Sequence, residues 1–278
     1  MARQELGSSE SIAFSMTASQ RMRRRYSGQG REGNTLAKLI TIVCMGDSIT
    51  FGQHLDPTLR WSSLLHAHYD ARFQDTDIHV QVLNCGISGE TTRMGLERFP
   101  NDVQSAQPDI MTLQFGMNDC NCWLSDHGLS RVSLPAYRAN LVEMIERARR
   151  SGCRHIILST NHVSLRRKPM LSGERYDDAN ARYSRTLRAV ADEMGVALCD
   201  MRRTFESFAA DELERLLLPY PDHLHLSAEG NKVYFRTIFP QVDAALEQVL
   251  HAKTEPSIPV NHWTAAPGRD RVVEHVLN

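Results

Sequence analysis

Ser48 is the residue of this chain that is best placed to act as a nucleophile. It follows Gly46 and Asp47, directly after a run of apolar or β-branched residues at 40–45. Such a run predicts a strand buried on both faces of a parallel sheet, and open α/β folds bind their ligands at the carboxyl ends of these strands. A serine hydroxyl is a weak nucleophile at neutral pH, so it needs a nearby base and donors for the oxyanion that its attack creates.

A base and a carboxylate that could orient it occur together late in the chain. Asp222 precedes His225 by three residues, in a predicted turn that leads into a helix. This spacing lets a carboxylate hold one ring nitrogen of His225 while the other nitrogen faces Ser48. Taken alone, an Asp-x-x-His segment can simply cap a helix, so its chemical meaning depends on the remaining loops.

Two further loops offer hydrogen-bond donors. Gly89 lacks a Cβ atom and can present its backbone N–H to an incoming carbonyl group, and Asn118 can donate from its side-chain nitrogen. Both residues follow predicted strands, as Ser48 does. Each such donor contributes roughly 3 kcal/mol of transition-state stabilisation.

Alternating strands and helices are predicted to position these loops. Strands are expected at 40–45, 78–83, 110–115, 155–160 and 196–200, and helices at 57–73, 91–105, 135–150, 176–194, 203–217 and 227–250. This order predicts an α/β fold with one five-stranded parallel sheet and helices on both faces. The carboxyl ends of the strands then meet at one edge, which brings the four loops together.

Four segments resemble the four sequence blocks of the SGNH hydrolases, also called the GDSL esterase/lipase family. They are Gly-Asp-Ser-Ile-Thr at 46–50, Gly-Ile-Ser-Gly-Glu-Thr at 86–91, Gly-Met-Asn-Asp at 116–119 and Asp-His-Leu-His-Leu-Ser at 222–227. The resemblance runs from about residue 39 to residue 250. It implies a flavodoxin-like, three-layer α/β/α hydrolase that needs no metal or other cofactor.

The resemblance also implies roles for individual residues. Ser48 would be the nucleophile, His225 the base and Asp222 the carboxylate that orients it. The oxyanion hole would consist of the Ser48 N–H, the Gly89 N–H and the Asn118 side chain.

Two positions depart from the family pattern. Ile49 replaces the leucine of the family name, and His223 stands where glycine is frequent. The histidine leaves the implied roles intact but raises a question about the local backbone.

The function implied is a serine esterase that hydrolyses small carboxylic esters, with short acyl chains or acetyl groups, through an acyl-enzyme on Ser48. The family also contains thioesterase, lysophospholipase and acetylesterase branches. Transfer of the acyl group to an alcohol or sugar, and ligand binding without turnover, remain open alternatives. The pKa of His225 is expected at about 6.5 or higher beside Asp222.

Several side chains near the motifs have a structural and a functional interpretation. Trp123, just past Asn118, is a candidate pocket residue. The basic run 166–168 either recognises an anionic group on the substrate or forms a solvated loop. Cys120 and Cys122 are expected to be small loop residues rather than a redox pair.

Acidic and histidine side chains near the motifs are given structural roles. Asp47 is expected to cap a helix, and Asp119 to brace Asn118. His223 and His225, with His162 elsewhere, form a poor zinc signature, so no metal is expected.

Composition gives weak but consistent limits. A formal charge of −1 and a pI near 6.9 indicate no nucleic-acid partner, and no apolar run is long enough to span a bilayer. The chain begins without a secretory signal, and its six scattered cysteines suggest reduced thiols, so a cytoplasmic location is expected. An arginine-rich stretch at 21–25 leaves organelle targeting open. The expected division is a loosely attached basic segment at 1–36, a hydrolase domain at 37–252 and a tail at 253–278.

Overall fold

The computed structural model describes residues 38–252. The expected N-terminal segment at 1–36 and the expected tail at 253–278 lie outside the described residues. The region expected to form the hydrolase domain is described from Lys38 onward.

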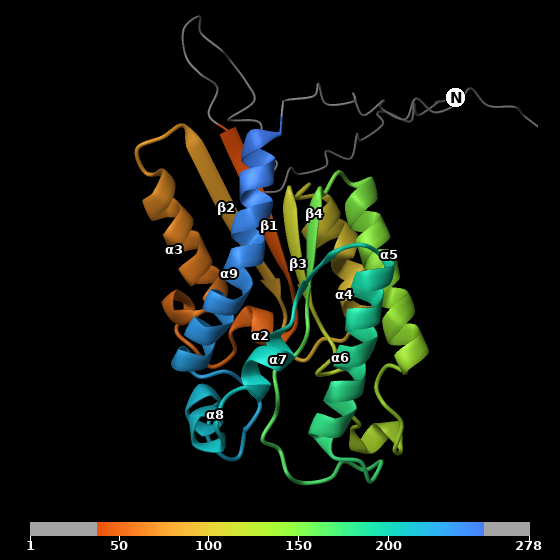
Figure 1. Ribbon diagram of the computed structural model, residues 1–278. Helices are drawn as coiled ribbons and strands as arrows, with labels where there is room; N and C mark the ends of the chain where they lie inside the picture. The colour runs from red at the N-terminus through yellow and green to blue at the C-terminus, as the bar shows by residue number, and fades with distance from the viewer. Residues whose placement is uncertain (1–37, 253–278) are drawn as a thin grey trace, which may run out of the picture.

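Five parallel strands form the centre of the molecule (Figure 1). They are β1 Lys38–Gly46, β2 Ile78–Gly86, β3 Ile110–Gln114, β4 His155–Ser159 and β5 Ala197–Cys199, in the order β2-β1-β3-β4-β5. All four neighbouring pairs are parallel. The predicted five-stranded parallel sheet is therefore confirmed.

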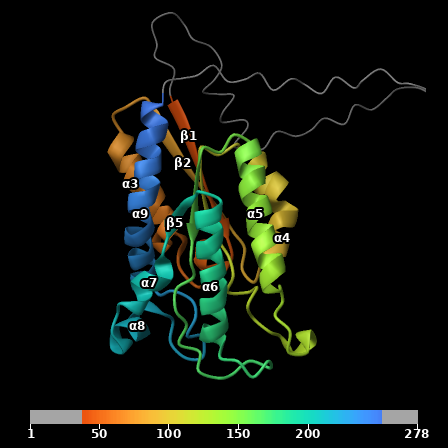
Figure 2. The same cartoon turned by 45° about the vertical axis from the view of Figure 1, so that its right-hand side comes forward.

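Helices cover both faces of this sheet. The longer ones are α3 Trp61–Phe73, α4 Thr92–Phe99, α5 Leu134–Arg150, α6 Tyr176–Glu193 and α9 Ala228–His251. Helices α3 and α9 pack together on one face, and α4, α5 and α6 pack in succession on the other (Figure 2). Between residues 38 and 252, no helix combines the length and the apolar character that crossing a membrane requires.

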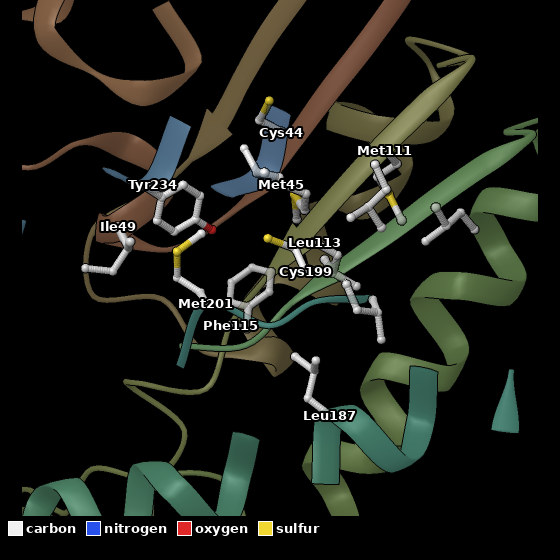
Figure 3. Packing of buried hydrophobic residues seen from close by; sticks show 14 of the residues in the cluster. Cys44, Met45, Ile49, Met111, Leu113, Phe115, Leu187, Cys199, Met201 and Tyr234 are labelled. Carbon is white, nitrogen blue, oxygen red and sulfur yellow. The ribbon is translucent and has the colours of Figure 1, made fainter. Parts of the chain in front are cut away.

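The core lies on both sides of the central strands. Seven of the nine residues of β1 are buried, as are all five residues of β3, because each strand is covered by helices on both faces. Figure 3 shows part of this core, in which Met45 and Leu113 of the sheet pack in the same cluster as Met201 and Tyr234. The well-packed sheet fixes where the loops at its carboxyl edge begin.

The prediction of one continuous helix at 203–217 is wrong. The structure has two short helices, α7 Met201–Glu206 and α8 Ala210–Leu216. Asp200 caps the first, and the second begins where the Glu212 carboxylate accepts from the Ala209 N–H at 2.9 Å. Two competing helix starts thus divide a segment whose apolar spacing alone predicts one helix.

Two other predicted helices also contain a break. The segment 57–73 begins with a 3-10 turn, Pro57–Leu59, before Arg60 becomes extended and α3 starts. The segment 91–105 ends α4 at Phe99 and continues as a wider π-helical turn, Pro100–Gln104. The second break lies beside Pro100, which lacks the N–H that a continuous α-helix needs.

Candidate active site

Ser48 opens the short helix α2, Ser48–Phe51, directly after β1. Asp47 is the N-cap, and its Oδ1 accepts from the Ile49 N–H at 2.9 Å, as expected for a capping residue. At Gly46 the chain is so crowded that a Cβ atom would lie 2.1 Å from Thr50 Oγ1. The glycine therefore permits the tight turn that carries Ser48 to the edge of the sheet.

The structure brings Ser48, His225 and Asp222 together in one hydrogen-bonded chain. His225 Nε2 lies 2.9 Å from Ser48 Oγ, and His225 Nδ1 lies 2.7 Å from Asp222 Oδ2. The other carboxylate oxygen, Oδ1, accepts from the backbone N–H groups of Leu224 and His225 at 2.9 and 2.6 Å. Because Oδ1 is held by the backbone, Oδ2 has a fixed direction toward the ring.

His223 has a backbone conformation that glycine enters more easily than other residues. Its φ angle is +50°, in the left-handed region that glycine enters at lowest cost. Its N–H donates to the Leu218 carbonyl at 3.2 Å, and its carbonyl accepts from the Leu165 N–H at 3.0 Å. These bonds on both sides hold the strained residue, so the spacing from Asp222 to His225 is maintained.

Burial decides the protonation preference of His225. The residue is only 8% exposed, and this burial lowers the pKa of its ring below the ordinary value, although the hydrogen bond and charge of Asp222 act to raise it. The expectation of a pKa at or above the ordinary value is therefore wrong, because the cost of burying a charged ring was left out. The neutral ring, which can accept a proton, is favoured.

Asp222 shows the opposite balance. Partial burial raises the pKa of its carboxyl, but the hydrogen bonds from His225 and from backbone N–H groups lower it by more, and the net shift is downward. The carboxylate is therefore ionised at neutral pH. A charged carboxylate facing a neutral ring fixes the proton on Nδ1 and leaves the lone pair of Nε2 toward Ser48.

Asn118 lies next to the loop that carries Ser48. Its Nδ2 lies 3.5 Å from Asp47 Oδ2. Asp47 is fully buried, and this burial raises the pKa of its carboxyl to about 7.

Asp119 does not brace Asn118 as expected. Its Oδ1 accepts instead from the N–H and the hydroxyl of Thr92, at the start of α4, because the tertiary fold places that helix end closer.

Gly89 is held by an arginine that sequence reasoning missed. Its φ angle is +81°, and space is open around its Cα atom: apart from Gly89 and its two chain neighbours, no atom of residues 38–252 lies within 4 Å of where a Cβ would be. Arg131 Nη1 donates to the Gly89 carbonyl at 2.9 Å. The Arg131 guanidinium lies over the Trp123 ring, 3.7 Å from its centroid. Trp123, a residue that is 49% exposed, thus supports this arginine, and its contact with substrate stays a prediction.

The basic run 166–168 reaches the site through its first residue. Arg166 Nε donates to the Asp222 carbonyl at 2.9 Å. A cavity of about 330 Å³ lies beside it, with Arg166, Lys168, Asn121 and Tyr176 in its lining. Tyr176 in turn donates to the Met117 carbonyl at 2.6 Å, one residue before Asn118.

Cys120 and Cys122 are buried free thiols. The Cys120 thiol donates to the Met117 carbonyl at 3.4 Å. This contact supports the structural interpretation of the pair.

His54 is a second residue that the sequence did not indicate. It is exposed, with a φ angle of +69°, and its ring lies edge-on to that of His225 with centroids 5.3 Å apart. The only sequence signal is its position shortly after Ser48, which by itself does not predict a contact with a loop far along the chain.

The comparisons with known proteins agree with this geometry. Residues 44–233 match the model of the GDSL-like lipase/acylhydrolase family. Esterase TesA of Pseudomonas aeruginosa is 30% identical over 158 residues, which are 57% of this chain and 68% of that protein. The arylesterase of Vibrio mimicus is 30% identical over 137 residues, 49% of this chain and 60% of that protein.

A solved structure gives the same result. The lipase/acylhydrolase from Enterococcus faecalis superposes with a TM-score of 0.60 at 25% identity, covering 74% of this chain and 96% of that one. Family, relatives and fold agree with the four sequence blocks. The chain therefore belongs to the GDSL-like lipase/acylhydrolase family, the SGNH hydrolases, and is an enzyme that acts on ester bonds.

Proposed function

We propose that this protein is a serine esterase that hydrolyses small carboxylic esters through an acyl-enzyme on Ser48. The observation that carries the proposal is the chain of two hydrogen bonds from Asp222 through His225 to Ser48, at 2.7 and 2.9 Å. It joins a nucleophile, a base and an orienting carboxylate in the arrangement that acyl transfer requires.

In the first step, His225 Nε2 takes the hydroxyl proton while Ser48 Oγ attacks the carbonyl carbon of the ester. Asp222 holds the ring and stabilises the imidazolium that forms. When the tetrahedral intermediate collapses, His225 gives the proton to the leaving alkoxide. The acyl group then remains on Ser48, and the alcohol departs.

The oxyanion of the tetrahedral intermediate would be bound by three donors: the N–H groups of Ser48 and Gly89, and Nδ2 of Asn118. The close approach of Asn118 to Asp47 supports this assignment, because it places the amide beside the nucleophile loop. The hold of Arg131 on the Gly89 carbonyl supports it too, because it fixes the backbone that carries the second donor.

In the second step, water attacks the acyl-enzyme with His225 again acting as the base, and free acid leaves. Short acyl chains or acetyl groups are proposed as the acyl part. Two relatives carry the names esterase and arylesterase, which supports ester cleavage. We also propose a cytoplasmic, reducing environment. The six cysteines support this part of the proposal, because all of them are free thiols.

The test compares hydrolysis of p-nitrophenyl acetate by the wild-type chain and by Ser48→Ala. Loss of nearly all activity, together with loss of labelling by a fluorophosphonate probe, is expected for the variant. Ser63→Ala is a matched control on α3, outside the proposed machinery, and should retain the wild-type rate. Equal rates for the wild type and Ser48→Ala would refute the assigned nucleophile.

A further inference from the structure

His54 lies beside His225 and Asp222, so that three side chains able to bind a metal ion are close together. His54, Asp222 and His225 can each offer one ligand atom such that all three atoms lie within 4.8 Å of one another. His225 and Asp222 come from one loop and His54 from the loop after α2, so only the tertiary fold assembles the set. This group does not include His162, which the sequence analysis considered together with His223 and His225. His162 Nε2 instead forms a hydrogen bond with the Leu224 carbonyl oxygen at 2.7 Å.

His54 is available to bind. Its side chain is exposed, and its Nε2 accepts from the Gln53 side-chain amide at 2.8 Å, so this ring nitrogen carries a lone pair. An incoming ion would exchange one weak, exposed hydrogen bond for a metal–nitrogen bond. The His54 ring lies edge-on to the ring of His225, the proposed base.

The donor set selects a class of ion. Two imidazoles and one carboxylate are ligands that suit Zn²⁺ and neighbouring transition metals, whereas Mg²⁺ and Ca²⁺ prefer sites made of oxygen atoms. Zinc bonds of about 2.0–2.2 Å in tetrahedral geometry place neighbouring donors roughly 3.3 Å apart. Binding therefore requires the contact of 2.7 Å between Asp222 and His225 to widen and His54, which lies on an exposed loop, to approach the pair.

We propose that His54, Asp222 and His225 form a Zn²⁺ site through which the ion inhibits the enzyme. Because Asp222 faces His225 Nδ1, an ion held by all three residues binds this nitrogen. The single ring proton then moves to Nε2, which faces Ser48 as a donor. The base is lost without any covalent change.

The charge around the site limits how tightly it binds. Arg166 lies beside it as a fixed cation, donating to the Asp222 carbonyl at 2.9 Å. It opposes a second positive charge nearby, and the ion must also compete with the hydrogen bond between Asp222 and His225. Binding is therefore reversible, and a chelator restores activity.

The primary test measures binding rather than activity. Zn²⁺ is titrated by calorimetry into the metal-free Ser48→Ala chain, with His54→Gln added as a second substitution in a parallel sample. A third sample carries His66→Gln as a matched control, since His66 is an exposed histidine paired with Asp70 at 3.3 Å. We expect the His54→Gln sample to bind at least tenfold more weakly and the His66→Gln sample to bind unchanged.

The second readout uses p-nitrophenyl acetate hydrolysis at micromolar Zn²⁺. Wild type and His66→Gln should be inhibited and recover on addition of EDTA, while His54→Gln should resist the ion relative to its own rate without zinc. Equal zinc affinity with and without His54 would overturn the proposal. Because binding is measured on a chain without the nucleophile, that result is distinguishable from failure of the proposed esterase activity.

Discussion

Arg98 donates from Nη2 to the carbonyl oxygen of Gly46 at 3.1 Å, and so joins helix α4 to the last residue of β1. Its Nε also pairs with Glu90 at 2.5 Å, in a contact where the two side chains are only 14% and 10% exposed. Glu90 follows Gly89 directly. One guanidinium therefore ties the strand that leads to the proposed nucleophile, Ser48, to the loop that presents a proposed oxyanion donor.

Replacing this arginine should loosen both loops. We expect Arg98→Met to lower the free energy of unfolding by roughly 3 kcal/mol, because Glu90 is left as a nearly buried, unpaired charge. Urea unfolding and p-nitrophenyl acetate kinetics measure the two effects, and kcat should fall with stability. Arg147→Met is the control: its exposed pair with Glu143 contributes no more than about 1 kcal/mol. Equal losses in both variants would contradict this role for Arg98.

Asn118→Ala should remove one proposed oxyanion donor. We expect kcat to fall by roughly 10² to 10³-fold with little change in KM, because the lost hydrogen bond strengthens only as negative charge develops. Steady-state kinetics with p-nitrophenyl acetate measure both constants. Asn101→Ala, which changes an exposed asparagine in the turn Pro100–Gln104, should behave as wild type. A variant that loses affinity but keeps kcat would place Asn118 in substrate binding instead.

The pH profile should follow His225, which must be neutral to accept a proton. Activity is lost as pH falls through its pKa, and since burial lowers that pKa, the acid limb of kcat/KM should have its midpoint below the ordinary value of 6.5. Arg166 also lowers this pKa, so Arg166→Gln should move the midpoint upward. The exposed neighbour variant Arg167→Gln should leave it unchanged. A midpoint above 6.5 in the wild type would contradict the dominant effect of burial.

Gly46→Ala should destabilise the fold at the turn that precedes Ser48. The new Cβ would lie 2.1 Å from Thr50 Oγ1 and 2.6 Å from the Gln114 carbonyl oxygen, which belongs to a fixed strand. We expect a loss of about 3 kcal/mol in the free energy of unfolding, measured in urea.

Gly152→Ala separates crowding from backbone strain. Gly152 has a φ angle of +92°, but in the described part of the chain only Gly152 and its two chain neighbours have atoms within 4 Å of the position that an added Cβ would take. Its replacement therefore introduces strain alone and should cost about 1 kcal/mol. If the two substitutions destabilise equally, crowding at Gly46 is not the reason for its glycine.

The sequence by itself determined the strands, the family and the residue types at the proposed site. Alternation of apolar runs with helical segments is a local pattern, and it predicted the parallel sheet that the structure confirms. The segments that hold Ser48, Asp222 and His225 stand out because they resemble the first and last of four family blocks, and the other two blocks lie between them in the family order. The spacing of Asp222 and His225 is local too, so their contact follows from one turn of chain.

Only the tertiary structure decided the contacts between distant segments. The ring of His54 beside His225, the bridge from Arg98 to Gly46 and the bond of Asp119 to Thr92 each join loops that sequence spacing leaves unrelated. The lowered pKa of His225 belongs to the same class, because the burial that causes it depends on what the rest of the fold places around the ring. Local patterns fix elements through backbone geometry, whereas side-chain contacts and burial depend on how the completed elements pack.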